Sequence, residues 1–454
     1  MSTIHANTST RTIPGSMGTV KRTNYRWVVL VAVCLFQMVN FADRAIIGVV
    51  IPSLRTEFRI SNFEAGAVAS IFFFGYVLVL IPAGWLMSRI GVTRVVAVTV
   101  AVFSLITGVM GTATSAALLK VYRVGLGVFE APAAIGGNAT MKNWFPAKER
   151  GTAAGIVTAA TSSAVMAVPP IAVWILVNHG WRSVFFYFAI PGFFVALILF
   201  VFVRDLPEST PYSSPAEAAY IHDASDAEDG KETKATVASW GWLDKLLRAK
   251  HVDQIDTRVK AFQSKNIYGD ALTYGCMQMV YYGLLTWIPS YLVTAKHFSF
   301  GKMGWVAAAP WLGGLLGNIG GGVISDKLFG GRRKPMIFIS ALTTVIMMWF
   351  LIHVRADVTS LTITLFLAGV FLNCSWPSFF TYPMGLTTGQ IYPLAVSVII
   401  TGGNLGAFVS PMTVGFILDR YKSYDPVFAF FAGAAILAFI LVSFLDEPIL
   451  AGHH

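Results

Sequence analysis

The amino-acid sequence predicts an all-α membrane protein with twelve transmembrane helices, six in each half of the chain. The first observation is composition: 55% of the 454 residues are hydrophobic and 12% are charged, with a mean hydropathy of +0.65. Soluble domains carry about 25% charged residues. The second is that the apolar residues fall into stretches long enough to cross a bilayer, which takes roughly 20 residues in a helix. The third is a glycine-flanked, cationic loop that occurs at equivalent places in both halves.

The apolar segments divide into two sets of six. In the first half they cover residues 26–50, 64–87, 93–113, 116–138, 151–177 and 182–203. In the second half they cover residues 268–294, 304–326, 335–354, 359–383, 391–418 and 426–446. The first segment lacks a small-residue cleavage site and has charges at its centre, so we interpret it as a membrane helix and not as a cleaved signal peptide.

Polar stretches set the expected domain boundaries. Residues 204–265 are charged and separate the two sets of segments, so they are interpreted as a flexible cytoplasmic linker. Residues 1–24 are polar and rich in Ser and Thr, which predicts a disordered cytoplasmic tail. The two bundles are then expected at residues 25–203 and 266–447, with a second cytoplasmic tail at 448–454.

The distribution of Lys and Arg predicts that both termini face the cytoplasm. With the termini inside, the inward segments hold 22 of these residues and the outward loops hold 9. Positive charge favours the cytoplasmic side of a membrane. Nine of the 22 lie in the long linker, where the rule is weaker, and without them the ratio is 13 to 9. Topology therefore explains the net charge of +10 better than a nucleic-acid partner does.

Two loops resemble each other across the halves. The loop "GWLMSRIGVTR" (84–94) follows the second segment, and "GGVISDKLFGGRRKP" (321–335) follows the eighth. A chain of six plus six segments with this repeated loop resembles the major facilitator transporters over nearly its whole length. The resemblance implies two pseudo-symmetric six-helix bundles around a central cavity that opens alternately to each side. It also implies that these loops gate the change of conformation, through Gly84, Arg89, Gly91, Asp326 and Arg332. Ser88 departs from the family pattern, which usually has an acid there, so the gate in the first half is expected to be weaker or to depend on Arg89 alone.

Four ionisable residues lie well inside predicted spans: Asp43, Arg44, Arg123 and Glu130. A charge at the middle of the bilayer costs roughly 2.5–3.5 kcal/mol on insertion scales, so these side chains are expected to face protein or water and to pair. One interpretation is structural, with Arg44 paired to Glu130 or Arg123 paired to Asp43. The other is functional, and it is favoured because Arg123 and Glu130, seven residues apart, share one face of their helix.

Three stretches resemble the anion:cation symporter family: "NFADRAIIGVVIPSL" (40–54), "FFFGYVLVLIPAGWL" (72–86) and "YRVGLGVFEAPAAIGGNATMKNWFPAKERGTAAGI" (122–156). Its bacterial members include galactonate, glucarate, hexuronate and aromatic-carboxylate carriers. The resemblance implies that Arg44, Arg123 and Tyr76 bind the substrate. It also implies that Asp43 and Glu130 carry protons. Arginine suits a carboxylate because its planar guanidinium gives a bidentate grip and stays charged.

The second half offers further substrate-binding candidates. "YYGLLTWIPSYL" (281–292) resembles the seventh segment of the family, so Tyr281 and Tyr282 are candidates to face the cavity, although an aromatic at helical spacing is more often packing. Of the two, Tyr281 is taken as the substrate-binding candidate. "LNCSWPS" (372–378) matches a family region near the ligand and adds Asn373 and Trp376. In "TGGNLGAFVSP" (401–411), Asn404 either lines the cavity or bridges helices.

The function expected is import of an organic carboxylate, with a sugar acid favoured, by proton symport through alternating access. Aromatic or dicarboxylic acids, sodium coupling, uniport and an anion channel remain alternatives. No metal spacing, cofactor fingerprint or serine elbow occurs, so neither an enzyme nor a cofactor other than the proton is expected. The resemblance implies a monomer in the bacterial inner membrane.

Overall fold

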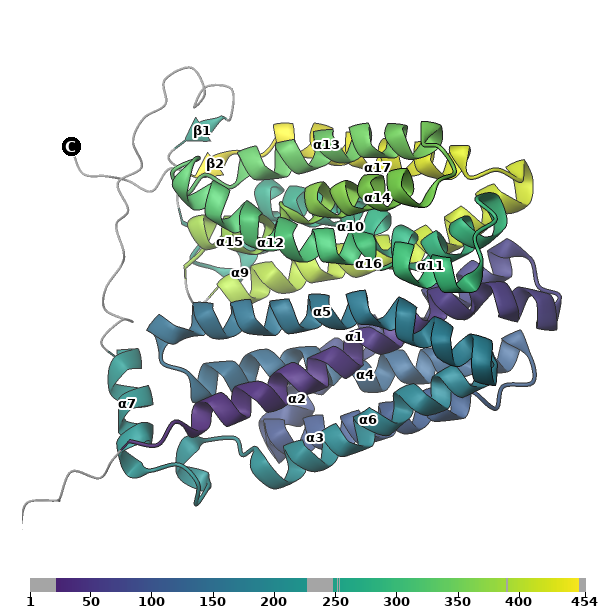
Figure 1. The fold of residues 1–454 in the computed structure, drawn as a ribbon. Helices are drawn as coiled ribbons and strands as arrows, with labels where there is room; N and C mark the ends of the chain where they lie inside the picture. The colour runs from purple at the N-terminus through teal and green to yellow at the C-terminus, as the bar shows by residue number, and fades with distance from the viewer. Residues whose placement is uncertain (1–21, 227–247, 251, 253, 389–390, 449–454) are drawn as a thin grey trace, which may run out of the picture.

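The computed structural model describes residues 22–226, 248–250, 252, 254–388 and 391–448 as two helical bundles that lie against each other (Figure 1). The bundles correspond to the two halves of the chain, as the sequence predicts. The helices of the N-terminal bundle are α1 (Tyr25–Phe58), α2 (Asn62–Ile90), α3 (Val92–Met110), α4 (Ala116–Trp144), α5 (Ala147–His179) and α6 (Trp181–Phe202).

The C-terminal bundle has two interrupted helices. Its elements are α10 (Lys265–Ser290), the π-helix η2 (Tyr291–Ala295), α11 (Phe300–Val306), α12 (Ala309–Lys327), α13 (Lys334–His353), α14 (Val358–Asn373), α15 (Trp376–Leu386), α16 (Tyr392–Tyr421) and α17 (Asp425–Ser443). The predicted segment 359–383 is broken at Cys374 and Ser375, where α14 ends. Both interruptions precede a proline in the first turn of the next helix, Pro310 in α12 and Pro377 in α15. Proline fits that turn because it has no N–H to leave unpaired there.

Short elements lie at the end of the molecule where α1 begins, which we call the linker face (Figure 1). They are η1 (Pro207–Ser209), α7 (Pro215–Asp226), β1 (Ala249–Lys250), α9 (Arg258–Gln263) and β2 (Glu447–Pro448). Strands β1 and β2 pair in parallel, with Ala249 opposite Glu447. The Glu447 carboxylate accepts the backbone N–H groups of Arg333 and Lys334, both at 2.9 Å. Burial raises the pKa of Glu447, although these two hydrogen bonds oppose the rise.

Part of the predicted flexible linker is a helix docked on the N-terminal bundle. Glu217 of α7 is buried, and its carboxylate accepts the backbone N–H groups of Tyr25 and Arg26 at 3.0 and 3.1 Å. The Arg26 guanidinium also pairs with Glu217 at 3.0 Å and with Glu149 of α5 at 2.9 Å. One carboxylate therefore satisfies the first N–H groups of α1, which have no partner within their own helix.

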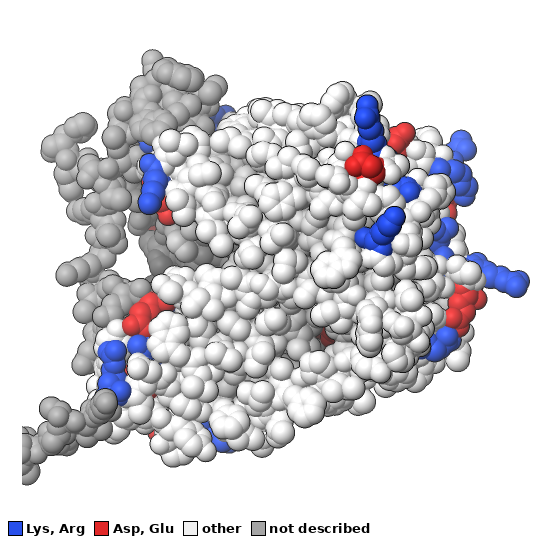
Figure 2. All heavy atoms as spheres, in the orientation of Figure 1, with Lys and Arg blue, Asp and Glu red and all other residues white. Residues whose placement is uncertain are grey.

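The surface agrees with a protein that spans a membrane. Figure 2 shows charged side chains toward the two ends of the molecule, with an almost uncharged band between them. Ten helices in the described residues are long and apolar enough to cross a bilayer. Helices α4 and α10 have 29 and 26 residues but are more polar, and α4 includes Arg123 and Glu130. The count of twelve spans stays a prediction.

The two bundles interlock at the end opposite the linker face, which we call the loop face. Helices α2 and α16 meet there so closely that a Cβ atom on Gly66 would lie 2.2 Å from the carbonyl oxygen of Pro411. Asp419 of α16 accepts the backbone N–H groups of Asn62 and Phe63, at 3.0 and 2.8 Å, and the Asn62 side-chain amide at 2.8 Å. The first turn of α2 is thus capped by the other bundle.

Candidate functional site

Arg44 is bonded to both halves of the protein. Its Nε donates to Oε1 of Glu130 in α4 at 2.9 Å, and its Nη1 donates to the hydroxyl of Tyr282 in α10 at 3.1 Å. Its Nη2 donates to Oδ1 of Asn40, one turn earlier in α1, at 3.2 Å. Arg44 is buried, so these bonds replace the hydration that the guanidinium loses.

Aromatic rings surround the same guanidinium. Its central carbon lies 4.8 Å from the ring centre of Phe41, 5.1 Å from that of Phe72 and 5.0 Å from that of Tyr76. A cation over an aromatic face is stabilised by the ring quadrupole, more strongly when water is excluded. Tyr76, predicted to bind the substrate, therefore lies beside the arginine predicted to do the same.

The two carboxylates predicted to carry protons are both buried, and each has one oxygen without a hydrogen-bond partner among the described residues. Glu130 is 0% exposed, and its Oε2 has no hydrogen-bond partner among the described residues. Asp43 is 1% exposed; its Oδ2 accepts the Thr107 hydroxyl at 2.9 Å, and its Oδ1 lacks a described partner. An unsatisfied buried carboxylate oxygen is costly, and protonation reduces that cost.

Arg123 lies in the same region but binds backbone. Its Nε and Nη2 each lie 3.3 Å from a carbonyl oxygen of α2, those of Val68 and Ala69, and its Nη1 has no described partner. Its guanidinium carbon lies 4.9 Å from the centre of the Phe72 ring. Of the two structural pairings considered above, Arg44 with Glu130 forms, whereas no ion pair joins Arg123 to Asp43 in the described chain.

Close packing of α2 against α4 brings these groups together. A Cβ atom on Gly127 would lie 2.1 Å from the carbonyl oxygen of Phe72, and one on Gly75 would lie 2.3 Å from that of Val124. Only glycine permits this approach, as small residues do generally between membrane helices. The contact sets Phe72 and Tyr76 against the face of α4 that holds the site residues.

The aromatic candidates of the C-terminal half form one cluster. The Tyr281 ring centre lies 5.1 Å from that of Trp311, 5.2 Å from that of Trp376 and 5.1 Å from that of Tyr282. Tyr281 and Trp376 are half-buried in this cluster. The hydroxyl that reaches Arg44 belongs instead to Tyr282, which the sequence offered beside Tyr281.

The two asparagine candidates bond within their own helices. Asn373 is buried, donates to the Gly369 carbonyl at 2.9 Å and packs against Gly314 of α12. Asn404 is half-buried and donates to the Ile400 carbonyl at 2.9 Å. Both side chains therefore bond backbone here, and neither bonds Arg44.

Several polar residues of the region were not singled out by the sequence. Asn40 is four residues before Arg44, a spacing that places both on one helix face, so that signal was available. Thr107 and Gln278 are uncharged residues in apolar stretches and gave no signal. Gln278 donates to the Tyr274 hydroxyl at 2.7 Å, and its Oε1 has no described partner.

The first gate loop is stabilised by an acid from another part of the chain. Gly91 has a φ of 101°, which favours glycine, and α3 begins directly after it. The carboxylate of Asp205, just after α6, accepts the backbone N–H of Thr93 at 2.7 Å. The guanidinium carbon of Arg89 lies 4.2 Å from the centre of the Trp85 ring. Position 88 of this loop is a serine and not an acid, but Asp205 supplies a carboxylate that bonds the loop from the end of α6.

The remaining gate residues differ in their contacts. Gly84 is half-buried, with open space where a Cβ atom would be. Asp326 pairs with Arg333 at 2.7 Å. Arg332 is buried, and its carbonyl oxygen accepts the Ser325 hydroxyl at 3.0 Å. The ion pair with Asp326 thus involves Arg333, the residue directly after the gate residue Arg332.

The central arrangement suits anion binding and proton transfer. A buried guanidinium grips a carboxylate through two parallel hydrogen bonds, and here a protein carboxylate occupies part of that fork. No cluster of His, Cys, Asp and Glu able to hold a metal ion occurs among the described residues.

Comparisons with known proteins agree with this architecture. The sequence matches the Major Facilitator Superfamily over residues 33–328 and again over 271–453. It is 27% identical to the protein named "Probable galactarate/D-glucarate transporter GudP" of Bacillus subtilis (strain 168), over 94% of this chain and 93% of that protein. It is 26% identical to "Probable sulfoacetate transporter SauU" of Cupriavidus necator, over 95% of this chain and 96% of the relative.

A solved structure shares the fold. The crystal structure of a D-xylose-proton symporter superposes with a TM-score of 0.71 at 17% identity, covering 95% of this chain and all of that one. The resemblance to sugar-acid carriers inferred from the sequence is confirmed by the named relatives. The chain belongs to the Major Facilitator Superfamily and is a transporter, not an enzyme.

Proposed function

We propose that this protein imports an organic carboxylate, with a sugar acid favoured, together with a proton. The observation that supports the proposal is the buried ion pair between Arg44 and Glu130 of the N-terminal bundle, at 2.9 Å, whose guanidinium also bonds Tyr282 of the C-terminal half. In this arrangement Glu130 accepts a hydrogen bond from the Arg44 guanidinium, which a substrate carboxylate would also need as its partner. Substrate and Glu130 therefore compete for Arg44.

A proton resolves that competition. Protonated Glu130 no longer attracts the guanidinium as an anion, so Arg44 becomes available to the substrate. A bound substrate in turn neutralises Arg44 and favours the protonated form of Glu130. Each ligand thereby strengthens the binding of the other, which is the linkage that a symporter requires. Asp43, whose Oδ1 has no hydrogen-bond partner among the described residues, is the second proton carrier in this proposal.

The substrate class follows from the site and the relatives. Arg44 and Arg123 favour an anion, and the hydrogen-bonding side chains of Tyr76, Tyr282 and Gln278 favour a hydroxylated one. The relative named for galactarate and D-glucarate supports a sugar acid. The relative named for sulfoacetate supports a second candidate, a small sulfonated carboxylate, because a sulfonate also accepts the two N–H groups of a guanidinium.

The orientation proposed places the linker face in the cytoplasm of a bacterial cell. The excess of Lys and Arg in the linker and in the loops on that face supports it. The interlocked loop face would then be periplasmic, and the protein would work as a monomer in the inner membrane.

The test is uptake into proteoliposomes that contain the purified protein. Aldarates, hexonates, hexuronates, aromatic carboxylates, short dicarboxylates and sulfoacetate are each offered under an inward proton gradient, an inward sodium gradient or no gradient. Internal pH is followed with a trapped dye. Liposomes that contain the Arg44→Gln variant serve as the matched control, because that variant lacks the proposed anion site.

The proposal expects uphill accumulation of one substrate class with internal acidification, only under the proton gradient. Accumulation driven by sodium, or equilibration without acidification, would remove proton coupling but retain anion transport. Equal uptake by the Arg44→Gln variant would overturn the assignment of the site.

A further inference from the structure

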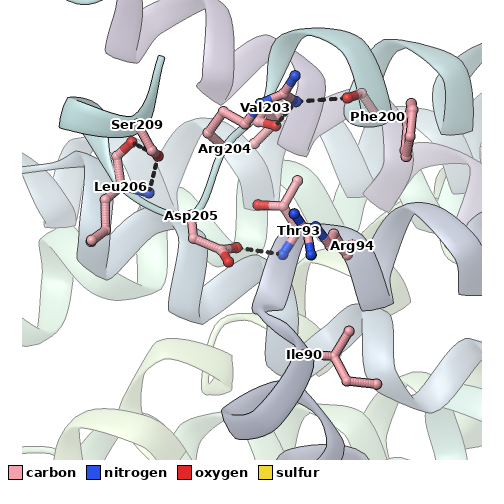
Figure 3. Close-up of a pocket in the computed structure, with 9 residues that line it drawn as sticks. All are labelled: Ile90, Thr93, Arg94, Phe200, Val203, Arg204, Asp205, Leu206 and Ser209. Carbon is pink, nitrogen blue, oxygen red and sulfur yellow. Dashed lines mark hydrogen bonds between the residues drawn. The ribbon is translucent and has the colours of Figure 1, made fainter.

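A second site lies on the outside of the N-terminal bundle, at the linker face. A cavity of about 490 Å³ opens there between the start of α3 and the end of α6 (Figure 3). Its walls are Ile90, Thr93, Arg94, Phe200, Val203, Arg204, Asp205, Leu206 and Ser209. None of these residues belongs to the central site around Arg44.

Two arginines from different elements line this cavity. Arg204 uses Nη1 to donate to the carbonyl oxygens of Phe200 and Val203, at 2.7 and 2.9 Å. Its Nε and Nη2 make no hydrogen bond with the described residues. Arg94 is exposed and makes no hydrogen bond or ion pair within the described chain. The cavity therefore offers guanidinium N–H groups that its own walls leave available.

The one acid in the wall is already engaged. Oδ1 of Asp205 accepts the backbone N–H of Thr93 at 2.7 Å, in the first turn of α3 (Figure 3). The positive end of that helix offsets part of the carboxylate charge. The wall holds two positive charges and one negative charge, and the negative one is already hydrogen-bonded. The cavity therefore suits an anion.

Apart from Thr93 and Ser209, the rest of the wall is apolar and belongs to the surface that we expect to face lipid. Phe200 is 61% exposed, and Ile90 and Leu206 are also exposed. Along α6, Phe194 and Leu197 are exposed as well, so this side of the helix contacts the hydrocarbon region of the bilayer. A soluble anion gains nothing from such a wall, whereas a phospholipid has an anionic head and an apolar tail on one molecule.

We propose that this cavity binds the phosphate headgroup of an anionic phospholipid of the leaflet at the linker face. Arg94 and Arg204 hold the phosphate by charge-assisted hydrogen bonds, and the acyl chains lie along Phe200 and Ile90. The lipid would thereby join the α2–α3 gate loop to the end of α6, two segments that Asp205 and Thr93 already connect.

The experiment is native mass spectrometry of the full-length, delipidated protein, titrated with phosphatidylglycerol or with phosphatidylcholine of the same acyl chains. The test variant is Arg94→Gln/Arg204→Gln. The charge-matched control is Arg258→Gln/Lys327→Gln, which removes two exposed cations of the linker face outside the cavity. Thermal unfolding midpoints confirm that both variants fold, as expected for substitutions of exposed side chains.

The wild type should bind its first phosphatidylglycerol more tightly than phosphatidylcholine. The Arg94→Gln/Arg204→Gln variant should bind it roughly tenfold more weakly, and the control variant should match the wild type. An Arg94→Lys/Arg204→Lys variant should be intermediate, because lysine keeps the charge but not the fork.

Three results would overturn the proposal. Equal phosphatidylglycerol binding by the test variant and the wild type would place the lipid elsewhere. Equal affinity of the wild type for the two lipids would remove the role of headgroup charge. If soluble glycerol 3-phosphate competes with phosphatidylglycerol at equal concentration, the cavity is a phosphate site without a lipid requirement.

Discussion

The Nε atom of Arg44 lies 2.9 Å from Oε1 of Glu130, and this ion pair is enclosed by protein. A buried pair of this kind is weak evidence for stability, because the cost of removing two ions from water offsets most of their attraction. A pair that one proton can break is, however, a suitable coupling element for a transporter. The proposed function therefore makes Glu130 the first residue to test.

Glu130→Gln should remove proton coupling and leave anion binding intact. Glutamine cannot take up the proton, so accumulation under an inward proton gradient should be lost while exchange of substrate for substrate continues. In the wild type, substrate affinity should rise as pH falls, because protonation of Glu130 releases Arg44. Binding measured by titration calorimetry over an acid-to-neutral pH series should lose this dependence in the variant.

The matched control for Glu130→Gln is Asp270→Asn. Asp270 is also a buried carboxylate without a described hydrogen-bond partner, but it lies about three helical turns before Tyr282 in α10. Its replacement should leave the pH dependence of binding unchanged. If Glu130→Gln keeps the wild-type dependence, the proton is carried by another group.

Asp43→Asn should abolish proton-driven accumulation and retain part of the exchange activity. The amide oxygen can still accept the Thr107 hydroxyl, so the local structure is kept and only the titratable group is lost. Uptake with and without a gradient measures the effect. Asp43→Glu, which keeps a carboxylate, should preserve part of the accumulation, and normal accumulation by Asp43→Asn would contradict a coupling role.

Arg44→Lys should weaken substrate binding although it keeps the positive charge. Lysine is a point charge without the planar fork, so the bidentate contact is lost and affinity should fall by roughly tenfold. Equilibrium binding of the best substrate measures this. The matched control is Arg59→Lys, an exposed arginine just after α1, which should bind as the wild type does. Wild-type affinity in Arg44→Lys would indicate a structural arginine.

The sequence predicted the two bundles because apolar length is a local property that a single chain reveals. It also offered Arg44 with Glu130 as one of two structural pairings, because a charge in an apolar helix needs a partner, and the family resemblance named Arg44 and Tyr76 together as substrate-binding candidates. The break at Cys374 was not predicted, although Pro377 and the polar Asn373 and Ser375 gave a local signal for it, because the apolar run is long enough to be taken as one span. Helix rotation is equally hidden, which is why the sequence favoured Tyr281 as the substrate-binding tyrosine whereas the hydroxyl that bonds Arg44 belongs to Tyr282.

The docking of α7 was missed for a related reason. Residues 204–265 are polar, and polar composition predicts a linker unless a specific partner is known. Glu217 has such partners in the first turn of α1, Tyr25 and Arg26, which lie 192 and 191 residues earlier in the chain. Long-range contacts of this kind depend on tertiary structure and leave no pattern along the chain.

Tyr282→Phe should reduce transport more than Tyr281→Phe does. The first change removes the hydroxyl that accepts from Arg44 and so the bond between the site arginine and the other half. The second leaves the aromatic packing with Trp311 and Trp376 in place. We expect Tyr282→Phe to lower substrate affinity several-fold, as the loss of a hydrogen bond to a charged group does. Equal effects in uptake and binding assays would show that the Tyr282 hydroxyl has no special role.

Asp419→Asn should loosen the interlocked loop face. Asp419 accepts three hydrogen bonds from Asn62 and Phe63 across the two halves through both of its oxygens. Asparagine has one acceptor oxygen, so at least one of these bonds is lost and the rest are weakened. The reporter is a cysteine placed by Ala65→Cys, a buried position in the first turns of α2, in a protein whose cysteines at 34, 276 and 374 are all buried. Labelling of that cysteine by a membrane-impermeant maleimide should become roughly tenfold faster in Asp419→Asn.

The control for this labelling experiment is Asp357→Asn. Asp357 is also an N-capping aspartate at the loop face, but it accepts the backbone N–H of Ser360 within its own half, at 2.8 Å. Its replacement should weaken one helix end without separating the bundles, so labelling at position 65 should stay at the wild-type rate. If both aspartate variants label equally fast, the effect is general destabilisation. If neither differs from the wild type, Asp419 does not hold the loop face closed, and the close packing of Gly66 on Pro411 must be sufficient by itself.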